Sequence, residues 1–359
     1  MRVRRLGLRS VLAFAICAFA LTACGGGTTG QETAPADEPD EGQALKVIHY
    51  VSGNLGDKSF FDSAERGLSK SGMVYGFETS TLVGGKDSAA WEPDLDKLSS
   101  SGNYDIIVVG TFPLTETVQR LAQRYPQQRF IFYDGSVADS PNVYSMLYSQ
   151  SEGSFLAGAF AAMVTTDPSF AGANPDKVIG FIGGLDDDLI NDFKSGYEQG
   201  AAYIDPEVKV IADYVGNFAD ESKAKELAYG QYRDGGADII YNVAGGAGLG
   251  ILAAGSEEGK YTIGVDSNQN PLYPGSVLTS MLKNVDESVF RALSLVRGGK
   301  LPYGETEILG VKEGAVGIAR DQHYEKYVPQ AIREKMKDIE VGIASDKIEV
   351  QSLLTKVQP

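Results

Sequence analysis

The stretch KVIHYVSGNLGDKSFFDSAERG, residues 46–67, decides the fold, because it joins an apolar run to a glycine-broken loop and then to a segment with helical spacing. A related stretch, KVIGFIGGLDDDLINDFKSG, begins at Lys177. Further on, DIIVVG and RFIFYDG within residues 105–135 correspond to DIIYNVAG and KYTIGVD within residues 238–266. The two pairs are offset by 131 and 133 residues, which indicates an internal duplication of one α/β unit. Chance similarity among parallel strands is the alternative.

Both halves alternate short, continuous apolar runs with segments whose apolar residues recur at helical intervals. Runs such as VIHYV and RFIFYD are typical of strands buried on both faces, and segments such as TETVQRLAQRY are typical of helices. This alternation predicts an α/β protein with two doubly wound parallel-sheet domains and right-handed crossovers. We expect one lobe to comprise residues 45–148 plus 271–301, and the other to comprise residues 149–270 plus 302–359.

The N-terminal residues predict export and a lipid anchor. MRVRRLGLRS is a basic region and VLAFAICAFA is an apolar region of signal-peptide length, so residues 1–23 are expected to be a lipoprotein signal peptide. LTAC, residues 21–24, resembles a bacterial lipobox, which implies lipidation of Cys24; an ordinary cleaved signal is the alternative. Residues 24–44 lack large apolar side chains and predict a disordered tether. We therefore expect a lipid-anchored protein on the extracytoplasmic face of the cell membrane.

Composition argues against several classes of function. The net charge of −16 becomes about −20 without the four arginines of the signal, which disfavours nucleic acid as a partner. Both cysteines lie at or before the lipobox, so no disulfide or thiol chemistry is expected. His49 and His323 are the only histidines, and His49 lies in the first predicted strand, where a packed structural role is expected. We therefore expect no catalytic residue, no metal and no cofactor.

Acidic, basic and aromatic side chains follow the predicted strands, at the edge where doubly wound sheets bind ligands. An aspartate accepts two hydrogen bonds from a vicinal diol, and a lysine can hold a hydroxyl or the aspartate itself. Two phenyl rings can sandwich a flat heterocycle. A diol joined to a flat base describes a nucleoside. The expected ligand-binding residues are Asp57, Ser59, Phe60, Phe112, Asp134, Phe218, Gly245, Gly246, Asp266 and Lys283.

Each of these residues also has a structural alternative. An aspartate after a strand often caps the following helix, Phe112 and Phe218 can belong to a core, and Lys283 can be a solvated surface lysine. The glycines of GGAGLG, residues 245–250, lack the G-x-G-x-x-G spacing of a dinucleotide fingerprint. They still allow close approach of the backbone to a ligand.

Several motifs together resemble the basic membrane protein family, which comprises substrate-binding lipoproteins of ABC transporters and includes the purine nucleoside receptor. They are GDKSFFDSAERGL, NVYSMLYSQSEGSFLAG, VIGFIGG, YVGNFAD, AGGAGLG, IGVDSNQ and TSMLKNVD, within residues 45–340. The resemblance implies a type I periplasmic-binding fold with a hinged cleft, a nucleoside ligand and an ABC permease as partner. It also implies roles for individual residues. Phe60 and Phe218 would sandwich the base, with Phe193 in reserve, and the ribose would be held by Asp266, Lys283 and Asp134.

The expected function is therefore that of a monomeric, lipid-anchored solute-binding protein of an ABC importer, binding a nucleoside, with a purine expected. Gly56 and Phe61 stand where the family often has asparagine, so another flat ligand such as riboflavin remains an alternative. A ligand sensor without transport is a second alternative. A third is a hydrolase that uses Asp57 or Asp134 as a general base on the glycosidic bond.

Overall fold

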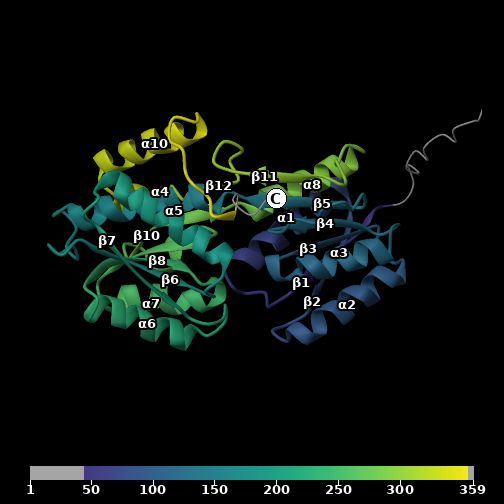
Figure 1. Ribbon diagram of the computed structural model, residues 1–359, viewed down its shortest axis with the longest axis horizontal. Helices are drawn as coiled ribbons and strands as arrows, with labels where there is room; N and C mark the ends of the chain where they lie inside the picture. The colour runs from purple at the N-terminus through teal and green to yellow at the C-terminus, as the bar shows by residue number, and fades with distance from the viewer. Residues whose placement is uncertain (1–43, 355–359) are drawn as a thin grey trace, which may run out of the picture. The chain divides into compact units, whose positions relative to one another are not determined.

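Two six-stranded sheets carry the fold (Figure 1). The computed structural model describes residues 44–354; the expected signal peptide, Cys24 and all but the last residue of the expected tether lie outside the described residues. The first sheet has the order β11-β5-β4-β3-β1-β2. Its strands are β1 (Lys46–Val51), β2 (Glu78–Val83), β3 (Ile106–Gly110), β4 (Arg129–Tyr133), β5 (Val143–Tyr148) and β11 (Thr306–Leu309).

The second sheet repeats this arrangement with the order β12-β10-β9-β8-β6-β7. Its strands are β6 (Val178–Gly183), β7 (Lys209–Tyr214), β8 (Ala237–Val243), β9 (Tyr261–Asp266), β10 (Val277–Lys283) and β12 (Val316–Ile318). Neighbouring strands are parallel in both sheets, except that β12 runs antiparallel to β10. The predicted α/β class with two doubly wound parallel sheets is confirmed, and the matching strand order is what a duplication predicts.

Helices cover both faces of each sheet. Those of the first lobe are α1 (Phe60–Tyr75), α2 (Ser88–Ser101), α3 (Thr115–Arg124) and α8 (Val285–Arg297), with the 3₁₀ helix η1 (Phe112–Leu114). Those of the second lobe are α4 (Gln150–Thr166), α5 (Asp188–Ile204), α6 (Glu221–Arg233), α7 (Gly248–Glu257), α9 (Gln322–Tyr327) and α10 (Gln330–Ala344), with η2 (Gly245–Ala247) and η3 (Asn270–Leu272). Within residues 44–354, no helix combines the length and apolar character needed to cross a bilayer.

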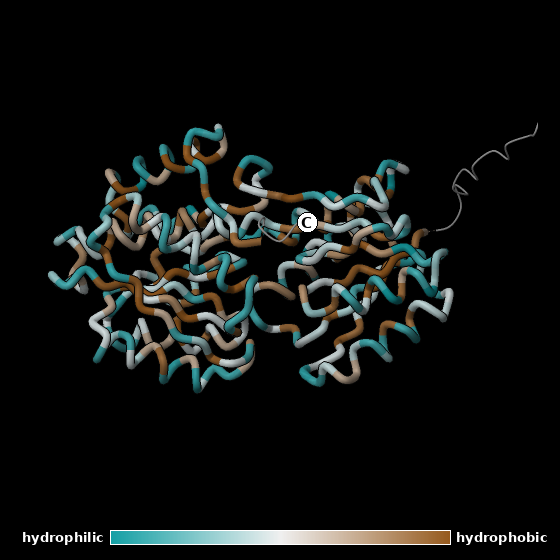
Figure 2. Tube along the Cα trace, in the orientation of Figure 1, coloured by the Kyte–Doolittle hydropathy of each residue, from teal (hydrophilic) through white to brown (hydrophobic). Residues whose placement is uncertain are grey.

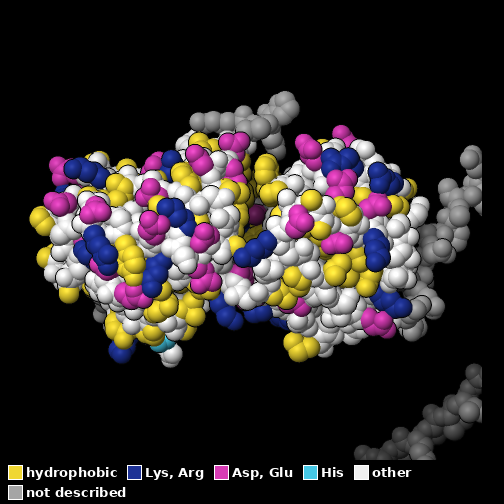
Figure 3. All heavy atoms as spheres, turned by 90° about the horizontal axis from the view of Figure 1, so that it is seen from below, with side chains coloured by type: hydrophobic (Ala, Val, Ile, Leu, Met, Phe, Trp, Pro, Cys, Tyr) yellow, Lys and Arg dark blue, Asp and Glu magenta, His cyan; other side chains and the backbone are white. Residues whose placement is uncertain are grey.

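The strands alternate their side chains between two helical layers, which is why inner strands such as β3, β4 and β6 are almost entirely apolar. In the first sheet, Ile48 and Tyr50 pack toward α2 and α3, whereas Val47 packs with α1 and α8. In the second sheet, Ile182 and Ile240 pack toward α6 and α7. Figure 2 shows the brown apolar strands inside mainly paler and teal helices, and Figure 3 shows acidic and basic side chains interspersed on the face in view.

The lobe boundaries differ in part from the expected ones. The chain first crosses between the lobes after Tyr148, because α4 packs against strands of the second sheet. Residues 271–283, however, belong to the second lobe, since β10 pairs with β9. The chain returns to the first lobe only at α8, which packs on α1, and β11 then pairs with β5 before the last crossing to β12. The first lobe therefore comprises residues 44–148 and 285–309, and the second comprises residues 149–283 and 316–354.

Helices α4 and α5 pack with their backbones in close approach. Gly158 on α4, and Gly196 and Gly200 on α5, lie at this contact, and a β-carbon on any of them would overlap a backbone carbonyl oxygen of the other helix. Backbone cannot move aside as a flexible side chain can, so these positions require glycine. This helix pair covers one face of the second sheet and carries Phe193.

We predict that Gly200→Ala lowers the free energy of unfolding by about 2 kcal/mol, because the added methyl group meets the Phe155 carbonyl oxygen. Gly230→Ala is the matched control, since Gly230 also lies within a helix but has open space around its missing β-carbon. That control should leave stability unchanged or raise it by about 0.5–1 kcal/mol. Urea unfolding measures both variants, and equal effects would contradict the packing described for α4 and α5.

Candidate functional site

Two aspartates end equivalent strands of the two sheets. Asp134 follows β4 and Asp266 is the last residue of β9, so each lies at the carboxyl edge of its sheet. Both have a left-handed backbone, with φ of 60° and 61°. A positive φ is uncommon for residues other than glycine, and aspartate is among those that tolerate it. The duplicated fold thus presents one buried carboxylate from each lobe.

A buried ion pair joins the two lobes. Lys283, the last residue of β10, places its Nζ 2.6 Å from Oδ1 of Asp134, and their side chains are 2% and 7% exposed. The expected alternative of a solvated surface lysine is wrong for Lys283. Removing one partner of a buried pair leaves an uncompensated charge, which costs about 3–5 kcal/mol. The pair therefore ties the position of β10 to that of β4.

The second carboxylate, Asp266, has no cationic partner within ion-pair distance among the described residues. Its Oδ2 accepts a hydrogen bond of 2.5 Å from the hydroxyl of Ser59, which lies at the start of α1 in the first lobe. Burial raises the pKa of Asp266 to about 6, against the opposing effects of Lys283 and Ser59. At neutral pH the group is an ionised, largely buried acceptor with unused hydrogen-bonding capacity.

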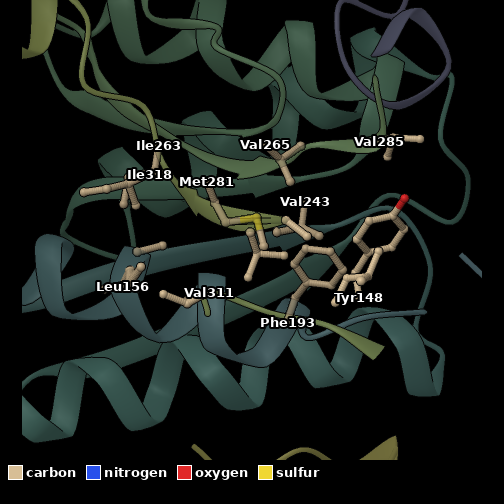
Figure 4. Packing of buried hydrophobic residues seen from close by; sticks show 14 of the residues in the cluster. Tyr148, Leu156, Phe193, Val243, Ile263, Val265, Met281, Val285, Val311 and Ile318 are labelled. Atoms are coloured by element: carbon tan, nitrogen blue, oxygen red, sulfur yellow. The ribbon is translucent and has the colours of Figure 1, made fainter. Parts of the chain in front are cut away.

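Three aromatic rings surround the ammonium group of Lys283. Its Nζ lies 5.6 Å from the ring centroid of Phe60, 5.3 Å from that of Tyr148 and 5.0 Å from that of Phe193. Phe60 and Tyr148 come from the first lobe and Phe193 from the second; Figure 4 shows Tyr148 and Phe193 side by side in the packed cluster. Distances below about 6 Å favour cation–π attraction. The site therefore combines π faces with two carboxylates and one ammonium.

Further hydrogen bonds link the loop before α1 to the segment after β9. Ser267 donates from Oγ to the backbone oxygen of Ser59 at 2.9 Å, and Arg66 donates to the same Ser267 hydroxyl at 3.1 Å. Gln269 donates to the backbone oxygen of Lys58 at 3.3 Å. These bonds run between the lobes beside Asp266, so the lobes meet at this point through polar groups.

Asp57 caps the start of α1, which is the structural alternative to ligand binding given for the aspartates in the sequence analysis. Its carboxylate accepts hydrogen bonds from the backbone amides of Ser59, Phe61 and Asp62, at 3.0, 2.8 and 3.1 Å, at the N-terminus of α1. These amides would otherwise lack partners in the helix. Burial raises the pKa of Asp57, and the three amides offset this only in part. The carboxylate therefore fixes the helix start that carries Ser59 and Phe60.

The remaining predicted residues lie outside the lysine cluster. Phe218 is 40% exposed, and its ring packs against Gly184 and lies near Gly245. A β-carbon on Gly246 would lie 3.7 Å from Cβ of Asp57, in ordinary contact, so the two lobes approach each other at this glycine. Phe112 begins η1 and is 46% exposed, so the alternative that it belongs to a core is wrong.

Sequence reasoning missed three residues of this region: Tyr133, Tyr148 and Ser267. Tyr133 packs its ring 5.3 Å from that of Phe60, and Tyr148 faces Lys283. Both tyrosines lie inside predicted strands, where alternation decides which face a side chain takes. The sequence signal that could have identified Tyr133 is its position directly before Asp134. Ser267, directly after Asp266, carried a similar one.

Two parallel α/β lobes whose strand ends meet at a buried polar and aromatic cluster define a solute-binding protein with the type I periplasmic-binding fold. Solved structures agree. An ABC transporter solute-binding protein from Aeropyrum pernix K1 is 25% identical, with a TM-score of 0.78 over 86% of this chain and 94% of its own. A glucose-galactose binding protein, GanP, from Geobacillus stearothermophilus shows the fold alone, at 14% identity and a TM-score of 0.59 over 80% of this chain and 99% of its own.

The chain belongs to the family of PnrA-like ABC transporter substrate-binding proteins (Bmp), which matches residues 44–349. Among its relatives, basic membrane protein A1 of Borrelia garinii subsp. bavariensis is 29% identical, covering 86% of this chain and 88% of that protein. Basic membrane protein B of Borreliella afzelii is 30% identical, covering 85% and 86%. The resemblance to the basic membrane protein family is thereby confirmed. A family of substrate-binding proteins implies a small-molecule ligand and a permease partner.

Proposed function

We propose that this protein binds a nucleoside, with a purine expected, between its two lobes and delivers it to an ABC permease. The observation that carries the proposal is the cluster around Lys283, where Asp134 and Asp266 lie with Phe60 and Phe193. Polar and π-facing groups converge there from both lobes. A nucleoside matches this pairing, because its sugar offers hydroxyl donors and its base offers a flat ring.

The sugar would bind at the carboxylate of Asp266. Lys283 neutralises Asp134, so the charge of Asp266 is only partly balanced. An ionised buried carboxylate is stabilised by donors, and the two hydroxyls of a ribose diol are donors at the right spacing for one carboxylate. Charge-assisted hydrogen bonds contribute about 1.5–3 kcal/mol each. Ligand hydroxyls at Asp266 would compete with the Ser59 hydroxyl for the same carboxylate oxygens.

The base would stack on Phe60, with a second ring from the other lobe. Phe218 is the ring expected from the sequence, and its 40% exposure leaves part of the ring free. Phe193 is 2% exposed and faces the same ammonium as Phe60, which makes it the alternative second ring. Stacking contributes about 1–3 kcal/mol per base. With the sugar contacts, this supports an affinity in the micromolar range or tighter.

Closure of the lobes would couple binding to delivery. Ser59 from the first lobe and Asp266 from the second already meet directly, so a ligand that contacts both lobes stabilises the closed arrangement by its additional contacts. We further propose a lipid anchor at Cys24, which the lipobox-like LTAC supports. The anchor would hold the protein at the extracytoplasmic face, as a monomer beside its permease.

We predict that calorimetric titration of the purified protein detects binding of at least one of adenosine, guanosine, inosine and uridine. Phe60→Ala should weaken that binding at least tenfold, because it removes one stacking ring. Phe218→Ala and Phe193→Ala identify the second ring, as the one of the two whose loss has a similar effect. Tyr203→Ala is the control, since Tyr203 is an exposed aromatic residue on α5.

Riboflavin, ribose and glucose complete the panel. Heat with riboflavin alone would support the alternative flat ligand, and heat with a sugar alone would move the ligand class toward that of the sugar-binding structural neighbours. No heat with any nucleoside would contradict the proposal. Release of free hypoxanthine from inosine would instead support the hydrolase.

The lipid anchor is tested by labelling cells with an alkyne fatty acid. We expect incorporation into the wild-type protein and none into Cys24→Ala, because the acyl chains need the Cys24 thiol. Cys17→Ala is the matched control, since Cys17 is the only other cysteine and lies within the expected signal peptide. Labelling of Cys24→Ala at the wild-type level would contradict the anchor.

A further inference from the structure

A chain of hydrogen bonds, buried at His49 and Tyr133 and partly exposed at Glu65, runs from α1 to β4. His49 on β1 is fully buried, with Nδ1 3.0 Å from Oε2 of Glu65 and Nε2 2.8 Å from the hydroxyl oxygen of Tyr133. Glu65 also accepts a hydrogen bond of 2.8 Å from Thr81 on β2. His49 therefore joins α1 to β4, and its contact with Tyr133 spans 84 residues of sequence.

The hydrogen bond between His49 on β1 and Tyr133 on β4 has to span β3, the strand between them. β3 pairs with both, and Gly110 at its end pairs with Tyr133. A β-carbon on Gly110 would overlap the Tyr133 ring, so the ring lies against the bare backbone of this glycine. The absence of a side chain at Gly110 thus lets the Tyr133 hydroxyl reach His49. Because the Tyr133 ring packs directly against the backbone of Gly110, its position within the buried strand is restricted.

The proton positions along this hydrogen-bonded chain follow from the groups at its two ends, Glu65 and Tyr133. Burial acts to raise the pKa of Glu65, but the hydrogen bonds from His49 and Thr81 outweigh it and hold the pKa below its usual range. An ionised carboxylate only accepts, so His49 must carry a proton on Nδ1. Burial holds the pKa of the Tyr133 hydroxyl well above its ordinary value, so this hydroxyl keeps its proton. When the imidazole carries its single proton on Nδ1, Nε2 is the acceptor for the Tyr133 hydroxyl.

Tyr133 connects this chain to the ring expected to stack on the ligand. Its ring centroid lies 5.3 Å from that of Phe60, at an interplanar angle of 42°, and Phe61 packs edge-on against Phe60, also at 5.3 Å. We propose that Glu65 and His49 are positioning residues, which fix the Tyr133 ring and through it the orientation of Phe60. One consequence of this inference rests on the proposed function: loss of the hydrogen bonds from Glu65 to Tyr133 should weaken stacking of the ligand on Phe60.

The proton positions are tested first, in the protein without ligand. The chain has only two histidines, so nitrogen NMR of protein labelled at histidine gives one signal set for His49 and one for His323. We expect His49 to be protonated at Nδ1, and Tyr133→Phe to shift its Nε2 signal while leaving His323 unchanged. Protonation of neutral His49 at Nε2, or no response to Tyr133→Phe, would overturn the inference.

The consequence is tested by the affinity for inosine in a double-mutant cycle. Tyr133→Phe and His49→Phe should each weaken binding about three- to tenfold, the range of one hydrogen bond, and the double variant should lose no more than the larger single loss. Tyr50→Phe is the matched control, because its hydroxyl bonds to Asp94 and its side chain lies on the opposite face of β1. Tyr133→Phe keeps the ring, so it decides the question alone if His49→Phe does not fold.

The outcomes separate this inference from the proposal on which it rests. Inosine binding by the wild-type protein with unchanged affinity in Tyr133→Phe, or with losses that multiply in the double variant, would overturn the positioning role alone. Absence of binding by the wild-type protein to any nucleoside would overturn the proposed function, and the ligand part of this inference with it. Equal losses in Tyr50→Phe and Tyr133→Phe would also overturn the positioning role.

Discussion

The imbalance of buried charge where the two lobes meet is the constraint on which the candidate site depends. One buried ammonium, that of Lys283, serves two buried aspartates, and it pairs with Asp134 at 2.6 Å. Asp266 is left with a serine hydroxyl and a raised pKa. A buried carboxylate held this way is unfavourable unless donors reach it. The architecture therefore supplies a site that a molecule rich in hydroxyl groups would stabilise, and such a molecule would draw the two lobes together.

The duplicated fold explains how these groups come to face one another. Each doubly wound sheet brings its strand ends to one edge, and Asp134 and Asp266 end equivalent strands with the same left-handed backbone. Lys283 ends the strand next to that of Asp266. Rings then fill the space around the ammonium, with Phe60 at the start of α1 and Phe193 on α5. Asp57 serves the same site indirectly, because it fixes the helix start on which Ser59 and Phe60 depend.

Local patterns in the sequence were sufficient for the elements and for part of the cluster proposed as the site. Continuous apolar runs and helical spacing identified the strands and helices, and the rule that ligands gather at strand ends pointed to Asp134, Asp266 and Lys283. The predicted lobe boundary after β9 is wrong, because β10 is an apolar parallel strand that could belong to either sheet. Only its pairing with β9 places it in the second. The contact between His49 and Tyr133 depends on the register across β3 and on the missing side chain of Gly110, which no local pattern encodes. Whether an aspartate caps a helix or faces a ligand, as for Asp57, likewise depends on the backbone around it.

The most direct test of the charge imbalance is the pH dependence of nucleoside affinity, measured by calorimetry from pH 5 to 8 in the wild-type protein and in Asp266→Asn. The raised pKa means that the folded protein holds this proton more tightly than the unfolded chain does. The contribution of Asp266 to stability is therefore full below its ordinary pKa of 3.8 and is lost as the pH rises through about 6. Ligand affinity has the opposite sign, because hydroxyl donors need the ionised carboxylate: it should fall up to about tenfold per pH unit below 6 in the wild-type protein. Asp266→Asn should bind more weakly and show no such fall. A wild-type affinity that is flat across pH 6, or a variant that keeps the same pH dependence, would contradict the account.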